Sequence, residues 1–159
     1  MLNVLFICLG NICRSPMAEG IFRELVAKKK LSEQIACDSA GTAAYHIGKS
    51  PDHRTIEVLS DHEIKTKHKA KQLQASDFTS FDYLLVMDES NYENTCSLTV
   101  DKHNKVYKTL SFGEQLKTDV PDPYYGGKED FEEVYDLLDH SLTHFLDHLI
   151  TKHQLSCIN

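Results

Sequence analysis

Long hydrophobic runs are missing from this 159-residue chain. None approaches the roughly 20 consecutive apolar residues that a helix needs to cross a bilayer, so no membrane association is predicted. The apolar run at 2–8 has no basic residue before it and no small-residue cleavage site after it, and it is not expected to be a signal peptide. With 41% hydrophobic and 26% charged residues, the composition is that of an ordinary soluble globular protein.

An excess of basic charge is also missing. Lys and Arg number 17 against 24 Asp and Glu, which gives a formal net charge of −7. Nucleic-acid binding depends on clustered Lys and Arg that contact phosphates, so no nucleic-acid partner is predicted. An anionic ligand must then be held by a local positive site and not by the overall field.

Paired cysteines are missing as well. The five cysteines include no Cys-x-x-Cys pair, and no Cys/His group has zinc-finger spacing. Their odd number and the length of the chain argue against a disulfide framework, so reduced thiols in a cytoplasmic setting are predicted. The nine histidines are scattered, and neither a metal nor another cofactor is expected.

No internal repeat, low-complexity tract or linker interrupts the sequence, so a single domain over residues 1–159 is predicted. Apolar runs at 2–8, 35–39 and 81–87 are typical of buried strands, and 106–110 is a weaker strand candidate. Apolar residues recur at helical spacing over 15–30, from about 50 to 60, over 88–96 and over 130–153. The segment 117–128 is rich in Pro, Asp, Tyr and Gly, which predicts a loop.

This alternation of strands and helices predicts an α/β fold. We expect a three-layer sandwich with a central parallel sheet of about four strands and helices on both faces. Ligands bind to such sheets beyond the carboxyl ends of the strands. Cys8 and Asp88 both fall at such ends.

The most informative segment is CLGNICRS at 8–15, between the first strand and the first helix. A loop of this length can turn successive backbone N–H groups inward, and the helix that follows adds its unpaired N–H groups and partial positive charge. Gly10 and Asn11 are the residues best able to adopt a positive φ, which an inward-curling loop needs. The pattern predicts a phosphate-binding loop after the first strand.

Three side chains of this segment suit phosphate chemistry. The loop would stabilise Cys8 as a thiolate, which is a strong nucleophile. Arg14 offers a planar fork that can grip two phosphate oxygens. Ser15, followed by a proline, is predicted to be the helix N-cap and a donor to the departing thiolate. The alternative is an inert buried cysteine, which would leave Arg14 opposing the helix dipole without an anion to justify it.

The run CLGNICRSPMAE at 8–19 resembles the low-molecular-weight protein tyrosine phosphatases. Cys-x5-Arg alone is a weak pattern, but C-x-G-N-x-C-R-S-P after a short N-terminal strand is highly specific. The resemblance continues at 38–39 (DS), 68–70 (HKA), 81–83 (FDY), 87–91 (MDESN) and 122–126 (DPYYG), while 92–118 has no clear match. It implies that phosphotyrosine is hydrolysed through a phosphocysteine on Cys8, with Arg14 clamping the phosphate.

The resemblance also implies roles that the residue pattern alone does not reveal. Asp122 would be the general acid and then the general base, although by itself it is typical of an Asp-Pro turn. Ser39 and His68 would support Asn11 beneath the loop. Aromatic walls would form a deep slot suited to a flat phenyl ring and not to the short phosphoserine. The implied phosphate and substrate contacts are Leu9, Gly10, Asn11, Ile12, Cys13, Ser15, Tyr45, Tyr124 and Tyr125.

Two enzymes of the same fold are alternatives. Arsenate reductases need further cysteines, usually after the third strand, where this chain reads LLVMD at 84–88. Protein arginine phosphatases resemble C-x-G-N-T-C-R-S, and the bulkier Ile12 of this chain favours phosphotyrosine. A phosphocysteine carrier would have no use for Asp122. A catalytically dead binding module should have lost Cys8, Arg14 or Asp122, and all three are present.

The family also implies the partners, which are phosphotyrosine-containing proteins or small aryl phosphates, and a monomer or weak dimer. Cys13 suggests a regulatory hypothesis, because a curled loop could bring its sulfur close to that of Cys8. A reversible Cys8–Cys13 disulfide would protect the nucleophile from over-oxidation. The alternative is that Cys13 only packs beneath the loop.

Overall fold

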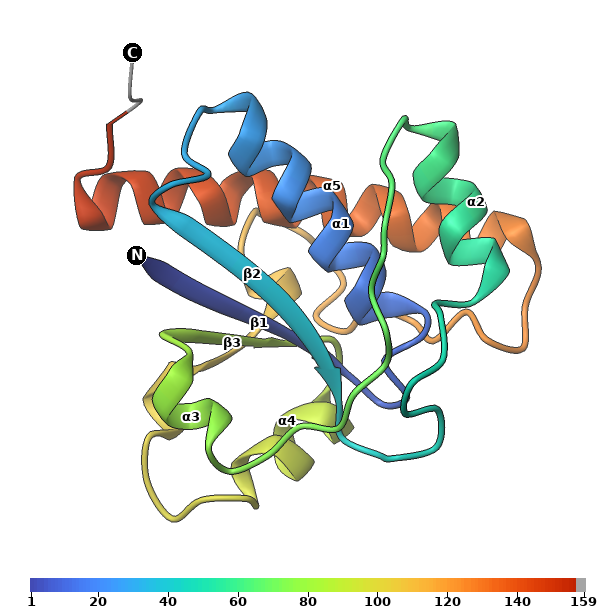
Figure 1. Cartoon of the computed structure of the whole chain (residues 1–159), viewed down its shortest axis with the longest axis horizontal. Coiled ribbons are helices and arrows are strands. Elements are labelled where there is room, and N and C mark those ends of the chain that lie inside the picture. The colour runs from blue at the N-terminus through green and yellow to red at the C-terminus, as the bar shows by residue number, and fades with distance from the viewer. Residues whose placement is uncertain (157–159) are drawn as a thin grey trace.

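The computed structural model describes residues 1–156 and is built around a four-stranded, all-parallel sheet. The strands are β1 (Leu2–Cys8), β2 (Ile35–Gly41), β3 (Tyr83–Val86) and β4 (Val106–Lys108), in the spatial order β2-β1-β3-β4. The order reverses around β1, which lies between β2 and β3 (Figure 1). A reversal of this kind opens a crevice at the carboxyl ends of the strands, where Cys8 is located.

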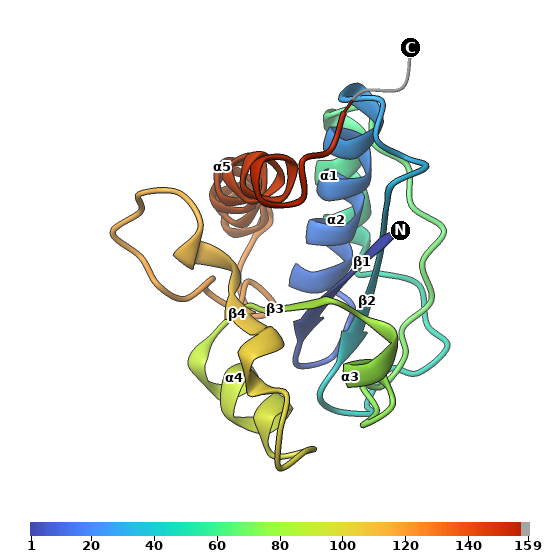
Figure 2. The ribbon, with the colours of Figure 1, turned by 90° about the vertical axis from the view of Figure 1, so that its left-hand side faces the viewer.

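Helices cover both faces of the sheet. On one face lie α1 (Arg14–Lys28), α2 (His53–Asp61) and α5 (Lys128–His153), and on the other lie α3 (Asp77–Ser80) and α4 (Glu89–Cys96) (Figure 2). Short 3-10 turns at His103–Lys105 and Thr109–Ser111 flank β4. The predicted three-layer α/β sandwich is therefore confirmed.

The alternation of side chains along β1 divides the core into two parts. Val4 and Phe6 point into the larger cluster beneath α1 and α5, while Leu5 and Ile7 point into the smaller cluster with Phe78 of α3. Successive strand residues face opposite sides of a sheet, so the continuous apolar run at 4–8 of β1 is buried by both helical layers. This double burial holds the end of β1 rigidly in place.

Several predicted boundaries are corrected. Helix α1 begins at Arg14 with Cys13 as its N-cap and no side-chain cap, so Ser15 lies inside the first turn and the prediction of Ser15 as N-cap was wrong. The last strand is shorter than predicted, because a 3-10 turn takes over at Thr109. The strand predicted at 81–87 is shorter in the structure, where β3 spans Tyr83–Val86. Helix α5 begins at Lys128, two residues before the predicted start. The four-residue α3 has too little periodicity to be read from sequence.

Among residues 1–156, no helix is both long enough and apolar enough to cross a membrane. Even α5, with 26 residues, is amphipathic. Its buried side chains form one stripe against the sheet, and charged and histidine side chains occupy the exposed face.

Candidate active site

The loop between β1 and α1 curls around one residue in the left-handed region. Asn11 has φ of 57° and is buried. Its Nδ2 donates to Ser15 Oγ at 2.8 Å and to Ser39 Oγ at 3.0 Å. Its Oδ1 accepts from the backbone N–H of Lys71 at 3.0 Å and lies 2.7 Å from His68 Nε2. These bonds hold a backbone conformation that is otherwise unfavourable for a non-glycine residue.

Gly10 does not have the backbone conformation that was predicted for it. Its φ is not positive, so the expectation that it shares the left-handed conformation with Asn11 was wrong. A Cβ at Gly10 would instead lie 2.9 Å from Cδ2 of His46. Gly41, paired with Cys8 at the end of β2, is similarly constrained, since a Cβ there would lie 2.7 Å from the carbonyl oxygen of Leu9. Close approach of backbone requires glycine at position 41, whereas a side chain at position 10 would require the His46 ring to move.

The support beneath Asn11 continues through an ion pair. His68 Nδ1 lies 3.0 Å from Glu19 Oε2, and Ser39 Oγ donates to the same oxygen at 2.8 Å. The N–H of Lys71 donates to Oδ1 of Asn11, which identifies that atom as the amide oxygen. Nε2 of His68 therefore faces the oxygen of Asn11, while Nδ1 faces the carboxylate of Glu19. Burial alone would raise the pKa of Glu19, but the bonds from His68 and Ser39 outweigh it and lower the pKa.

The group of Glu19, Asp38 and His68 has carboxylate and imidazole atoms within 4.8 Å of one another. Each carboxylate, however, also has a cation of its own: Arg23 binds Glu19 and Lys71 binds Asp38. The group is therefore a network of ion pairs that steadies the loop.

Cys8 lies at the carboxyl end of β1 and is only 3% exposed. Its Sγ is 3.0 Å from Ser15 Oγ. Because that hydroxyl already accepts from Asn11, its own proton can point to the sulfur, or to the carbonyl oxygen of Ala40 at 3.4 Å. Ser15, in the first turn of α1, is therefore placed where its hydroxyl can donate to the sulfur.

Arg14 is buried at 3% exposure and points across the crevice. Its Nη1 donates to Asp88 Oδ2 at 2.7 Å and to the carbonyl oxygen of Val120 at 3.0 Å, and its Nη2 lies 3.7 Å from Asp122 Oδ2. Burial alone would lower the pKa of Arg14, but Cys8 and Asp88 outweigh it and raise the pKa. The guanidinium is thus a permanent cation in a fixed orientation.

The sequence located Asp88 at a strand end but assigned it no role. Its second oxygen, Oδ1, accepts from the backbone N–H of Asn91 at 2.7 Å, which caps α4. The same carboxylate thus joins the helix start to Arg14. The Met-Asp-Glu-Ser-Asn motif is the signal that could have identified this residue.

Asp122 lies on the 117–128 loop, and its side chain is 45% exposed. The loop is tied down before it by the N–H of Val120, which donates to the carbonyl oxygen of Met87 at 2.7 Å. On the C-terminal side of Asp122, Arg54 fixes the loop by donating to the carbonyl oxygens of Tyr124 and Gly126 at 2.9 and 2.7 Å. Sequence reasoning missed Arg54, because nothing near it in the chain marks a partner some 70 residues away.

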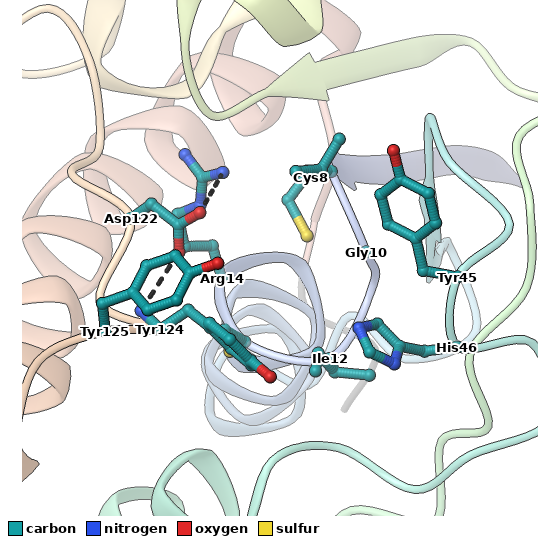
Figure 3. Close-up of a pocket in the computed structure, with 11 residues that line it drawn as sticks. Cys8, Gly10, Ile12, Arg14, Tyr45, His46, Asp122, Tyr124 and Tyr125 are labelled. Carbon is teal, nitrogen blue, oxygen red and sulfur yellow. Dashed lines mark hydrogen bonds and ion pairs between the residues drawn. The ribbon is translucent and has the colours of Figure 1, made fainter.

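These elements enclose a cavity of about 300 Å³. Figure 3 shows the sulfur of Cys8 at its centre, with Asp122 and Arg14 on one side and Tyr45 and His46 on the other. Tyr45 belongs to the segment that follows β2, and the N–H of Ala43 fixes this segment by donating to the carbonyl oxygen of Leu9 at 2.9 Å. The lining residues are Cys8, Leu9, Gly10, Ile12, Cys13, Arg14, Tyr45, His46, Asp122, Tyr124 and Tyr125.

The cavity thus brings together nearly all the predicted contacts. Asn11 and Ser15 lie behind the loop, and Ser39 and His68 lie farther beneath it. His46 is the lining residue that sequence reasoning missed, and only its position next to Tyr45 could have indicated it.

Four cysteines of the described residues, at positions 8, 13, 37 and 96, are free thiols, and Cys157 lies outside those residues. Cys13 lines the same cavity as Cys8 and is buried. Burial, followed by the nearby Asp52 and Cys8, raises the pKa of the Cys13 thiol. It is therefore a weak nucleophile at neutral pH.

Comparison with known proteins gives a consistent result. The family model described as "Low molecular weight phosphotyrosine protein phosphatase" matches residues 3–155, including the stretch 92–118. A curated relative of that name from Schizosaccharomyces pombe is 47% identical over 139 residues, which cover 84% of this chain and 88% of the relative.

Two solved structures are also similar. A protein tyrosine phosphatase from Entamoeba histolytica superposes with a TM-score of 0.91 at 36% identity, covering 98% of this chain and 100% of that one. An arginine phosphatase from Drosophila superposes with a TM-score of 0.85, also at 36% identity, covering 91% and 96% of the two chains.

Proposed function

The chain belongs to the family of low-molecular-weight phosphotyrosine protein phosphatases, and we propose that Cys8, Arg14 and Asp122 carry out its reaction. One observation supports this assignment above all others. The buried sulfur of Cys8 faces a cavity that Arg14 and Asp122 also line, with the two latter side chains 3.7 Å apart. A thiolate, a fixed cation and an accessible carboxyl group are the three groups that phosphate transfer to sulfur requires.

In the first step the phosphate of the substrate lies in the loop, bound by backbone N–H groups at the start of α1 and by Arg14. The Cys8 thiolate attacks phosphorus in line with the tyrosine oxygen. The S–P bond forms as the P–O bond breaks, and the proton of Asp122 moves to the departing oxygen. Arg14 follows the charge on the equatorial oxygens through the transition state.

In the second step water replaces the tyrosine. Asp122, now a carboxylate, accepts a proton from the water as its oxygen attacks phosphorus. The S–P bond breaks and inorganic phosphate leaves. The departing thiolate is stabilised by Ser15 Oγ, 3.0 Å from the sulfur, and by the N-terminus of α1.

The walls of the cavity suit an aromatic phosphate. Tyr45 stands on one side of the opening, and Tyr124 and Tyr125 stand on the other (Figure 3). A phenyl ring can pack between them while its phosphate reaches the buried sulfur, whereas phosphoserine is too short. Phosphotyrosine proteins or small aryl phosphates are the substrates we assign, for one domain over 1–159 that works in the cytoplasm as a monomer or weak dimer.

The test compares two leaving groups. Cys8→Ser should abolish hydrolysis of p-nitrophenyl phosphate. Asp122→Ala should lower kcat about 10²- to 10⁴-fold on phosphotyrosine and much less on p-nitrophenyl phosphate, whose leaving group needs little help from a proton. Equal losses on both substrates would argue against Asp122 as the acid. Activity should survive a metal chelator.

A second candidate function is hydrolysis of phosphoarginine, favoured by the similarity to the Drosophila arginine phosphatase. Ile12 lines the cavity and supplies apolar surface that suits a phenyl ring better than a guanidinium. Parallel assays on phosphotyrosine, phosphoarginine and, with thioredoxin present, arsenate would decide among the enzymes of this fold. Turnover of phosphoarginine above that of phosphotyrosine would overturn our assignment.

A further inference from the structure

The segment that joins α2 to α3 displays a row of lysines. Figure 1 shows it as a long open trace that runs past β2. Exposure alternates along it: Ile64 and Ala70 are buried and the His68 side chain is 5% exposed, whereas the four lysines between 65 and 71 are exposed. In an extended chain alternate residues point the same way. Lys65, Lys67, Lys69 and Lys71 therefore share one outward face, called here the lysine ridge.

Most of this positive charge is not neutralised within the protein. Lys71 binds Asp38, and Lys69 Nζ donates to the neutral hydroxyl of Ser50 at 2.7 Å. Within residues 1–156, no carboxylate lies at ion-pair distance from Lys65, Lys67 or Lys69. By contrast, Lys108, Lys117 and Lys128 elsewhere on the surface each have a carboxylate partner.

A hollow lies beside the ridge. It is lined by Lys65, Lys67, Arg23, Glu19 and His68. Three of these residues are cationic side chains at the surface, in a chain whose net charge is −7. The ridge is thus a local reversal of the overall charge, with room for a ligand against it.

The ridge begins close to the catalytic cavity. The N–H of Ala70 donates to the carbonyl oxygen of Lys49 at 2.8 Å, and the N–H of Lys49 donates to the carbonyl oxygen of His46 at 2.9 Å. Gly48 completes the connection by donating to the carbonyl oxygen of Ala70 at 2.8 Å. His46 lines the cavity. The bonds from Ala70 to Lys49 and from Lys49 to His46 therefore connect the end of the ridge near Lys69 to the cavity wall.

We propose that the lysine ridge binds acidic residues of the protein substrate, several positions away from its phosphotyrosine. The inference rests on the proposed function and names the class of substrate. An extended peptide advances about 3.3 Å per residue, so a strand that leaves the cavity past His46 reaches Lys69 and then Lys67 and Lys65. Lysines present mobile point charges, which suit carboxylates in varied positions better than one fixed phosphate.

Charge complementarity gives the ridge its purpose. The net charge of −7 repels an acidic substrate at long range, and the ridge supplies positive surface that attracts such a substrate toward the mouth of the cavity. Contacts of this kind act on substrate binding and leave the chemical step unchanged. Their effect should appear in KM and should weaken as salt is added.

The experiment uses phosphotyrosine peptides with a run of glutamates on the N-terminal or the C-terminal side, and matched peptides with glutamines. For the wild-type protein one glutamate peptide should have a KM about two- to tenfold below that of its glutamine counterpart, with equal kcat. Lys65→Gln with Lys67→Gln should abolish this difference. Hydrolysis of p-nitrophenyl phosphate by the same variant reports whether the active site is intact, so failure of the ridge and failure of the catalytic assignment are distinguishable.

The control is Lys28→Gln with Lys30→Gln, which removes two positive charges at the last residue of α1 and just beyond it, about 21 Å from the start of the helix. This variant should keep the preference for glutamate. Equal KM values for glutamate and glutamine peptides in the wild-type protein would overturn the proposal. A control variant that loses the preference for glutamate as fully as the ridge variant would overturn it too. Binding of phosphatidylserine vesicles that depends on Lys65 and Lys67, without a peptide effect, would overturn it in favour of a lipid surface.

Discussion

His68 supports the left-handed residue of the phosphate loop through its side chain, with Nε2 2.7 Å from Oδ1 of Asn11. The two residues are 57 positions apart in the chain. The other ring nitrogen is bound to Glu19 on α1, so one imidazole ties the loop to the helix that follows it. The curvature of the loop therefore depends on a segment that contributes no atom to the cavity surface.

The conformation of Asn11 predicts different outcomes for two substitutions. Asn11→Ala removes the side-chain hydrogen bonds that hold residue 11 at positive φ. Without them this left-handed conformation costs a non-glycine residue about 1–2 kcal/mol. Asn11→Gly removes the same bonds but relieves the backbone strain. Both should lower kcat/KM, by about 10- to 100-fold for alanine and less for glycine. Steady-state kinetics and thermal unfolding would check this; equal losses would show that side-chain bonds alone matter.

The two roles of Asp88 can be separated. Asp88→Asn should keep the cap of α4, because asparagine is an equally good N-cap, but it removes the charge that orients Arg14. We expect kcat/KM to fall about tenfold with little change in the free energy of unfolding. Asp88→Ala should lose the activity and about 1 kcal/mol of stability as well. Full activity in Asp88→Asn would contradict the orienting role.

Glu19 predicts a pH dependence of stability. Its pKa is lowered in the folded protein, so its contribution is fully present above the unfolded value of 4.5 and is lost as the pH falls through the folded pKa. Glu19→Gln should therefore be about 1–3 kcal/mol less stable than the wild type at pH 7, and the difference should shrink in acid. Urea unfolding at pH 7 and pH 3 would measure it. Glu24→Gln, at an exposed pair with Lys28, is the control and should change stability by less than about 0.5 kcal/mol.

The raised pKa of Cys13 bears on the redox hypothesis. After mild peroxide, the Cys13 sulfur should displace the hydroxyl of sulfenic Cys8 to give a disulfide and water, and the rate should rise with pH because the thiolate reacts. Cys13→Ala should lose activity irreversibly, whereas the wild type and Cys96→Ala should recover with dithiothreitol. Mass spectrometry that finds sulfinic Cys8 and no linked peptide would contradict the hypothesis.

The fold was largely predictable, because the signals are local. The continuous apolar run at 4–8 of β1 predicts burial on two faces, and the periodic apolar stripe of α5 predicts a helix on the sheet. Boundaries were less accurate where tertiary contacts compete with local preference. Ser15 looks like an N-cap, yet its hydroxyl is occupied by Cys8 and Asn11, and the helix begins at Arg14 without a side-chain cap.

By itself the sequence determined the alternating strands and helices and located the segment 8–15 at a strand end, since hydrophobic period and residue type act over neighbouring positions. Its resemblance to a family then indicated Asp122. Only the tertiary structure decided that Asp88 orients Arg14, that Arg54 anchors the loop that carries Asp122 and that His46 packs against Gly10. Each of these contacts joins residues far apart in the chain, and their distances depend on how the helices and loops pack around the sheet.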